Sequence, residues 1–311
     1  HYMLAGYAIV LGCCLVLAEW LQEKIGWWYA TALAFTLFHN LFYWHAGFWA
    51  MTALSNQAVI LFALLAARSA ARNPEAILAP LLWSLAAVTA QFNGLLVLPA
   101  LLAASIMVSL VNGEVQRRRQ WLVWAVFFFA STAVYFVYEN PFASDHLWRY
   151  VSYSDPGNLQ DYIKPSGEAF ELDLRRLLDA PLTFLVASGA SVFNLAHWLP
   201  AAVLGALLLV ALLYCGLTAQ ARADRFWWTV LFFVLASLLL VAVGRGLGFG
   251  PASGLLYRYR LYSFLLLVLL VGSLLQRKQA LPVLRVALVV ACWCNWLRCM
   301  CWMTLPKSAT G

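Results

Sequence analysis

Long apolar runs separated by short polar turns dominate the chain from one end to the other. Each run is close to the length needed for a helix to cross a bilayer, which is about 20 residues. The runs are too continuously apolar for the alternating strands of a membrane barrel. The pattern therefore predicts an all-α, polytopic transmembrane bundle of about ten spans. The predicted spans are 2–20, 29–44, 50–67, 76–92, 95–112, 121–138, 201–219, 226–244, 261–276 and 283–300.

One segment, residues 139–180, breaks this pattern because it holds eight of the thirteen acidic residues of the chain. We expect it to form an external loop. The stretch that follows, 181–199, is apolar but contains Pro181, Asn194 and His197, and it is predicted to be a re-entrant or interfacial helix. We find no internal repeat or low-complexity linker, so residues 1–311 are expected to form a single transmembrane domain.

The composition strengthens the membrane assignment. Hydrophobic residues make up 64% of the chain and charged residues 11%, with a mean hydropathy of +0.80, whereas charged residues make up about 25% of an ordinary soluble domain. These values exclude a soluble globular domain, a disordered chain and a disulfide-stapled secreted domain. The sequence predicts an integral membrane protein.

The formal net charge of +7 is interpreted through topology, since basic residues concentrate at the cytoplasmic ends of membrane helices. Nucleic-acid binding is not predicted; the basic clusters are expected to mark the cytoplasmic side, and residues 117–119 are expected to anchor the bundle to anionic lipid headgroups. Counting spans from them places 45–49, 93–94, 139–180 and 245–260 on the outer side. The clusters are Arg68 with Arg72, residues 117–119, Arg222 with Arg225, and Arg277 with Lys278.

Both ends of the chain fall on the outer side in this topology. The sequence starts apolar at His1-Tyr2-Met3 without a charged leader. An outward start predicts an odd number of spans upstream of His1, if the complete protein begins in the cytoplasm.

Cysteine and metal chemistry receive little support. Cys13, Cys14 and Cys215 lie in apolar runs and are expected to be small core residues. The four cysteines between 292 and 301 have no His or acid beside them, which makes a metal site improbable and leaves a disulfide open. The chain has no metal-ligand motif, no nucleotide-binding loop and no nucleophile elbow, so its cofactors stay undetermined.

Polar residues of the outer side are the candidate functional groups, because polar side chains at membrane depth are costly and often mark a site. Three arginines, Arg245, Arg258 and Arg260, follow or flank a glycine-rich stretch. Glycines allow close backbone approach, and guanidinium groups match phosphate oxygens. This pattern favours binding of a lipid phosphate headgroup. The alternative is that these arginines extend to the interface beside an aromatic belt.

Further candidates lie in other outer turns. His39 and Asn40 have the chemistry of acid/base or substrate-orienting groups, with a satisfied interfacial cluster as the alternative. Asn93 is a second candidate; alternatively, it satisfies backbone groups freed by the neighbouring Gly94. Lys164, just before Pro165, is expected to turn from the external loop toward the membrane.

Four short stretches together resemble a large family of bacterial polytopic membrane proteins that is similar in layout to GT-C glycosyltransferases. They are Gly244-Arg245 with Arg258-Tyr259 and Tyr262-Ser263, Phe38-His39-Asn40, 90–95, and 162–165. The arginine segment is the most specific of them.

The resemblance implies a protein of the bacterial inner membrane that transfers a sugar from a polyprenyl-phosphate donor to a glycan, lipid or protein acceptor at its periplasmic face. It implies an essential Asp in an external loop, which would lie upstream of His1. His39 stands where the family pattern leads us to expect an acid. The implied donor-binding residues are Arg245, Arg258, Arg260, Tyr259, Tyr262, Asn93 and Lys164, with His39 and Asn40 as the catalytic candidates.

Two other functions fit the same features. A transporter or flippase for lipid-linked glycans predicts ionisable groups near the middle of the membrane and paired broken helices. A non-catalytic accessory subunit would bind lipid through the same arginines.

Overall fold

The computed structural model describes residues 2–28, 30–31, 34, 53–112, 118–139, 174–192, 197–218, 223–243, 251–255 and 257–275, and these residues contain helices and no strand. The all-α prediction is confirmed for this part of the chain. The α-helices are α1 (Tyr2–Ile25), α5 (Ala58–Arg72), α6 (Leu78–Ala90), α7 (Val97–Asn112), α8 (Arg118–Glu139), α11 (Leu174–Ser188), α12 (Trp198–Gly216), α14 (Arg225–Val241) and α16 (Tyr257–Leu275). The short helices are η2 (Ala53–Gln57), η3 (Phe92–Leu96), η4 (Ala190–Val192) and η6 (Pro251–Leu255).

Three segments of the described chain are long and apolar enough to cross a membrane: Leu4–Ile25, Phe92–Asn112 and Trp198–Gly216. Shorter apolar segments lie at Leu78–Ala90, Leu178–Ser188, Arg225–Val241 and Tyr259–Leu275. These helices support a membrane protein. The number of ten crossings stays a prediction. The predicted span 283–300, most of the predicted span 29–44, and residues 140–173 of the predicted loop lie outside the described residues.

Several helices differ from the sequence prediction in their bounds; α5, for example, ends at Arg72 rather than at 67. Helix α1 runs to Ile25, beyond the predicted end at 20, because its polar last turns pair with other helices, as described below. Helix α11 begins at Leu174, inside the predicted loop 139–180. The predicted helix 181–199 is divided in the described residues between the end of α11, the short helix η4 and the start of α12.

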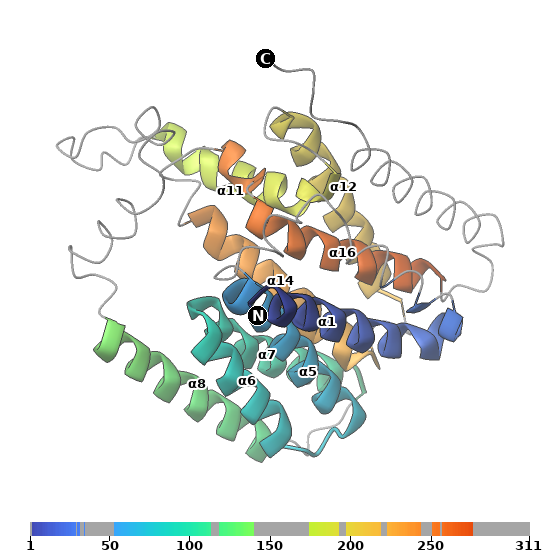
Figure 1. The fold of residues 1–311 in the computed structure, drawn as a ribbon, viewed down its shortest axis with the longest axis vertical. Coiled ribbons are helices and arrows are strands. Elements are labelled where there is room, and N and C mark those ends of the chain that lie inside the picture. The colour runs from blue at the N-terminus through green and yellow to red at the C-terminus, as the bar shows by residue number, and fades with distance from the viewer. Residues whose placement is uncertain are drawn as a thin grey trace.

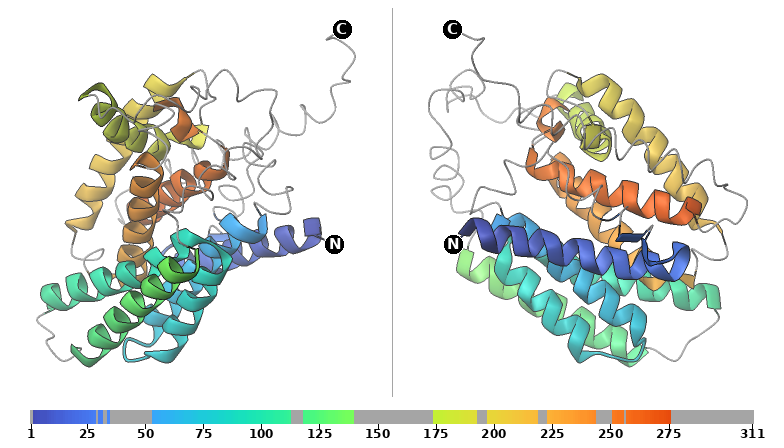
Figure 2. Two further views of the ribbon diagram at one scale, coloured as in Figure 1. Left: turned by 90° about the vertical axis from the view of Figure 1, so that its left-hand side faces the viewer. Right: turned by 45° about the vertical axis from the view of Figure 1, so that its right-hand side comes forward.

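Helix α14 occupies the centre of the arrangement and contacts α5 and α7 on one side and α16 and α11 on the other. Helices α5 to α8 lie together on one side of α1 and α14, whereas α11, α12 and α16 lie on the opposite side (Figures 1 and 2). Helices α5 and α6 form an antiparallel hairpin, so that the start of α5 lies beside the end of α6.

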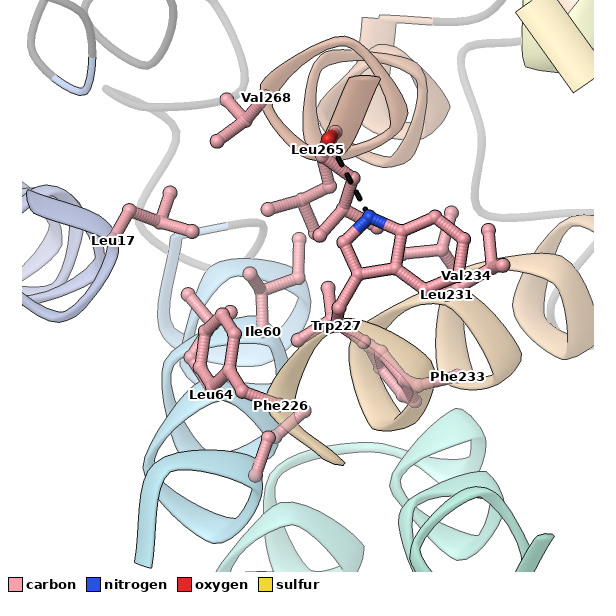
Figure 3. Close-up of a cluster of buried hydrophobic side chains, with 14 of the residues drawn as sticks. Leu17, Ile60, Leu64, Phe226, Trp227, Leu231, Phe233, Val234, Leu265 and Val268 are labelled. Atoms are coloured by element: carbon pink, nitrogen blue, oxygen red, sulfur yellow. Dashed lines mark hydrogen bonds between the residues drawn. The ribbon is translucent and has the colours of Figure 1, made fainter. Parts of the chain in front are cut away.

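Large side chains from α14 fill the space between these two groups. Trp227, Phe226 and Phe233 are all almost completely buried. The indole Nε1 of Trp227 donates a hydrogen bond to the backbone oxygen of Leu269 at 3.4 Å, while Phe226 faces α5 near Leu64 (Figure 3). Burial of these rings fixes α14 against both neighbouring groups.

The outward face of α12 is apolar, as expected of a surface in contact with lipid. Leu207 and Val210 are more than 60% exposed, whereas the inward residues include Ala201 and Gly205. A Cβ atom placed on Gly205 would collide with the backbone oxygen of Leu185 in α11. The start of α12 thus turns small residues toward the protein, as is typical of closely packed membrane helices, whereas Leu208 and Leu212 are the large residues buried further along.

Candidate functional site

A hydrogen bond joins two of the predicted site residues, Asn93 and Tyr262. The Nδ2 group of Asn93 in η3 donates to the phenolic oxygen of Tyr262 in α16, across 169 residues of sequence. Gly94 permits this placement because a Cβ atom there would collide with the backbone of Ala87. We call the end of the bundle that contains Asn93, Tyr262 and the start of α5 the polar end.

Tyr262 is deeply enclosed, with 2% of its surface exposed. The ring of Phe233 packs edge-on at a centroid distance of 6.2 Å. Ser237, also on α14, lies beside the phenol, although its own hydroxyl makes no hydrogen bond among the described residues. Three elements, η3, α14 and α16, therefore surround the Tyr262 hydroxyl.

Other residues at the start of α16 hold this region together. The Arg260 side chain is fully buried, and its Nε donates to the backbone oxygen of Leu255 in η6 at 3.2 Å. The Ser263 hydroxyl donates to the backbone oxygen of Ser188 at 2.5 Å and accepts from the backbone N–H of Ser191 at 3.1 Å. These contacts connect α16 to η6, α11 and η4.

The remaining predicted site residues are only partly described. Tyr259 packs partly buried against the core. Arg258 belongs to α16, but its side chain lies outside the described part of the structure. His39, Asn40, Lys164 and Arg245 lie outside the described residues. The structure thus brings Asn93 and Tyr262 together and leaves the roles of the other residues as predictions.

Gln57 is a buried polar residue that the sequence analysis missed. It ends the π-helical turn η2, has 1% of its surface exposed, and neither its Oε1 nor its Nε2 has a hydrogen-bond partner in the described chain. The available signal was the run Ser55-Asn56-Gln57 inside the apolar span 50–67. π-Helical turns of this kind occur frequently at functional sites.

The opposite end of the bundle carries ion pairs, and we call it the charged end. Lys24 of α1 contacts Asp224 at 2.6 Å, and the same carboxylate accepts a hydrogen bond from Trp20 Nε1 at 3.0 Å. Its other oxygen accepts from the backbone N–H of Trp227 at 3.0 Å and so caps α14. Asp224 therefore connects α1 to the start of α14.

Helix α5 joins the charged end through its last turns. Arg68 pairs with Glu23 and lies 3.5 Å from Glu19, which also pairs with Arg72. Arg225 donates from Nη1 to the backbone oxygens of Ala70 at 3.3 Å and Pro74 at 3.2 Å.

Arg68 and Arg225 are both buried, with 7% and 5% of their surface exposed. Their charges are directed at partners within the protein. The sequence clustering identified the correct helix ends but not these internal contacts.

The expected roles of the three described cysteines are confirmed. Cys13, Cys14 and Cys215 are buried and unbridged. Within the described ranges, no group of three or more His, Cys, Asp or Glu side chains could hold a metal ion.

Comparison with known proteins provides no relative for this chain. No family model, no curated protein sequence and no solved structure matches it.

Proposed function

We propose that the chain belongs to a GT-C-like glycosyltransferase of the bacterial inner membrane. It would transfer a sugar from a polyprenyl-phosphate donor to a glycan, lipid or protein acceptor at the periplasmic face. The observation that carries the proposal is the contact between Asn93 and Tyr262. It supports the proposal because each residue belongs to a stretch that resembles this family, and the two stretches are far apart in sequence.

Sugar transfer from a lipid phosphate is chemically compatible with the residues of the polar end. Arg245 and Arg258 would hold the phosphate, whose charge increases as the bond to the sugar breaks. Preorganised donors act most strongly where water is excluded. Asn93 and Tyr262 would orient the sugar, and His39 and Asn40 are the catalytic candidates.

The distribution of ionisable groups favours an enzyme over a transporter. A transporter is expected to carry them near the middle of the membrane. The ion pairs found in the described residues gather at the charged end, with Lys24, Arg68 and Asp224 as examples.

A transfer assay tests this proposal. Membranes containing the full-length protein are supplied with a radiolabelled polyprenyl-phosphate hexose, and label in glycan, lipid and protein is counted. We expect Arg258→Ala to abolish transfer. Tyr262→Phe should reduce it about tenfold, since loss of one hydrogen bond of about 1.4 kcal/mol has that effect.

Tyr214→Phe is the matched control, because Tyr214 lies on α12 and is 62% exposed. It should transfer sugar at the unmodified rate. Donor binding without transfer by the unmodified protein would contradict an enzyme and identify a non-catalytic lipid-binding subunit. Unchanged transfer by Arg258→Ala would refute the phosphate-binding role.

A further inference from the structure

A group of carboxamides at the polar end has more hydrogen-bonding capacity than the described part of the chain uses. Gln57 is almost completely buried, and both polar atoms of its side chain are without a partner in the described chain. The Oε1 of Gln91 and the Oδ1 of Asn93 are likewise buried without a partner there. Such atoms are rare in folded proteins, because removing them from water without a replacement partner is unfavourable.

The backbone brings these three residues to the same level of the bundle. Gln57 directly precedes α5, and Gln91 directly follows α6. Because α5 and α6 are antiparallel and pack together, these two positions lie at the same end of the hairpin. Contacts between η2 and α6, and between α5 and η3, agree with this placement. Asn93 follows in η3, where it also reaches Tyr262.

The hydrogen-bonding capacity of these unpaired side-chain atoms indicates the class of ligand. A carboxamide has two N–H donors and a carbonyl acceptor in one plane, so it can both donate to and accept from hydroxyl groups. The unused atoms comprise three carbonyl oxygens and one NH2 group, all of them uncharged. A neutral, polyhydroxylated group satisfies this set, whereas an anion would lie against several carbonyl oxygens.

We propose that Gln57, together with Gln91 and Asn93, binds the hydroxyl groups of a sugar at the polar end. This inference rests on the proposed function, to which it adds a recognition site for the sugar of the lipid-linked substrate. Its residues differ from the arginines proposed to bind the phosphate, and Gln57 is a sugar-binding residue in it.

Equilibrium binding to the full-length protein in lipid nanodiscs tests this assignment. The probes are a polyprenyl phosphate, the same lipid carrying a hexose, and free glucose. The unmodified protein should bind the hexose-linked lipid about tenfold more tightly than the unglycosylated lipid. Gln57→Leu should remove this difference and leave affinity for the unglycosylated lipid unchanged.

The same variant separates ligand binding from a structural role. Leucine has a similar volume and no polar atoms, so Gln57→Leu relieves the burial of two unpaired atoms. The melting temperature of the ligand-free protein should therefore stay the same or rise, whereas a structural role for Gln57 predicts that it falls.

Gln120→Leu is the control for this change. Gln120 is also buried, but its Nε2 donates to the backbone oxygen of Ala76 at 3.1 Å, at the charged end. It should retain the tenfold preference for the hexose-linked lipid.

The outcomes distinguish this inference from the proposed function. Equal affinity of the unmodified protein for both lipids overturns the sugar site while leaving phosphate binding intact. A preference that persists in Gln57→Leu also overturns it. If neither lipid binds, the proposed function fails together with the inference. A further outcome is that both lipids bind equally while free glucose binds and Gln57→Leu abolishes that binding. It would assign the carboxamides to an acceptor sugar and overturn the donor-sugar assignment.

Discussion

Replacement of Asp224 should reveal how strongly the charged end stabilises the bundle. Its carboxylate pairs with Lys24, accepts a hydrogen bond from Trp20, and caps α14 at the N–H of Trp227. The side chains of Lys24 and Asp224 are only 9% and 15% exposed. Asp224→Ala removes all three interactions, whereas Asp224→Asn retains a cap and an acceptor but loses the charge.

The expected magnitudes follow from these contacts. Loss of a helix cap costs about 1 kcal/mol, and breaking a buried ion pair from one side costs about 3 to 5 kcal/mol. Because the interactions share one side chain, their costs overlap. We expect Asp224→Ala to lower the free energy of unfolding by about 4 kcal/mol. Asp224→Asn should lower it by about 2 kcal/mol, the contribution of a hydrogen bond to a charged group.

A double-mutant cycle with Lys24→Met isolates the ion pair. Unfolding is followed by tryptophan fluorescence in mixed micelles with increasing sodium dodecyl sulfate. The loss in free energy of unfolding of the double variant, Lys24→Met with Asp224→Asn, should be about 2 kcal/mol smaller than the sum of the losses of the two single variants. A coupling below about 0.5 kcal/mol would refute the pairing, since independent sites add within that range. Equal effects of Asp224→Ala and Asp224→Asn would refute the capping role.

Two further predictions concern packing and the hydrogen bonds of Arg225. Gly205→Ala should destabilise the protein by about 1 to 3 kcal/mol, because the new methyl group meets the Leu185 backbone in α11. Faster hydrogen exchange of the α11 amides would check this. Gly26→Ala is the comparison for backbone strain alone, since its methyl group meets no atom within 4 Å but its φ is +84°. Arg225→Ala should cost about 2 to 4 kcal/mol in the same unfolding assay, since two backbone oxygens lose a charged donor, and unchanged stability would contradict it.

The sequence predicted the class of fold because continuous apolar runs are direct evidence of membrane helices. The end of α1 was missed because Glu19, Glu23 and Lys24 resemble a helix leaving the membrane. Their partners, such as Arg68 and Asp224, are 45 to 200 residues away. The local order of apolar and polar residues does not predict contacts between residues so far apart in the sequence.

The candidate site was also predicted only in part from the sequence. Topology predicted that Asn93 and Tyr262 would lie on one side of the membrane, and the structure brings them into contact. Gln57 was overlooked since apolar residues surround it and nothing local shows that its carboxamide is unpaired. The start of α11 at Leu174 was missed because the density of acids in 139–180 dominated the prediction.

The charged end also determines how the bundle can move. Lys24, Arg68 and Asp224 fix the spacing of α1, α5 and α14 at one end. At the other end, α5 starts from a π-helical turn, and the described contact between Asn93 and Tyr262 involves uncharged groups. Any separation of these helices is therefore expected to be smallest at the charged end, where the ion pairs hold them together. Entry of a long-chain ligand between helices would follow a hinge motion, in which displacement increases with distance from Asp224.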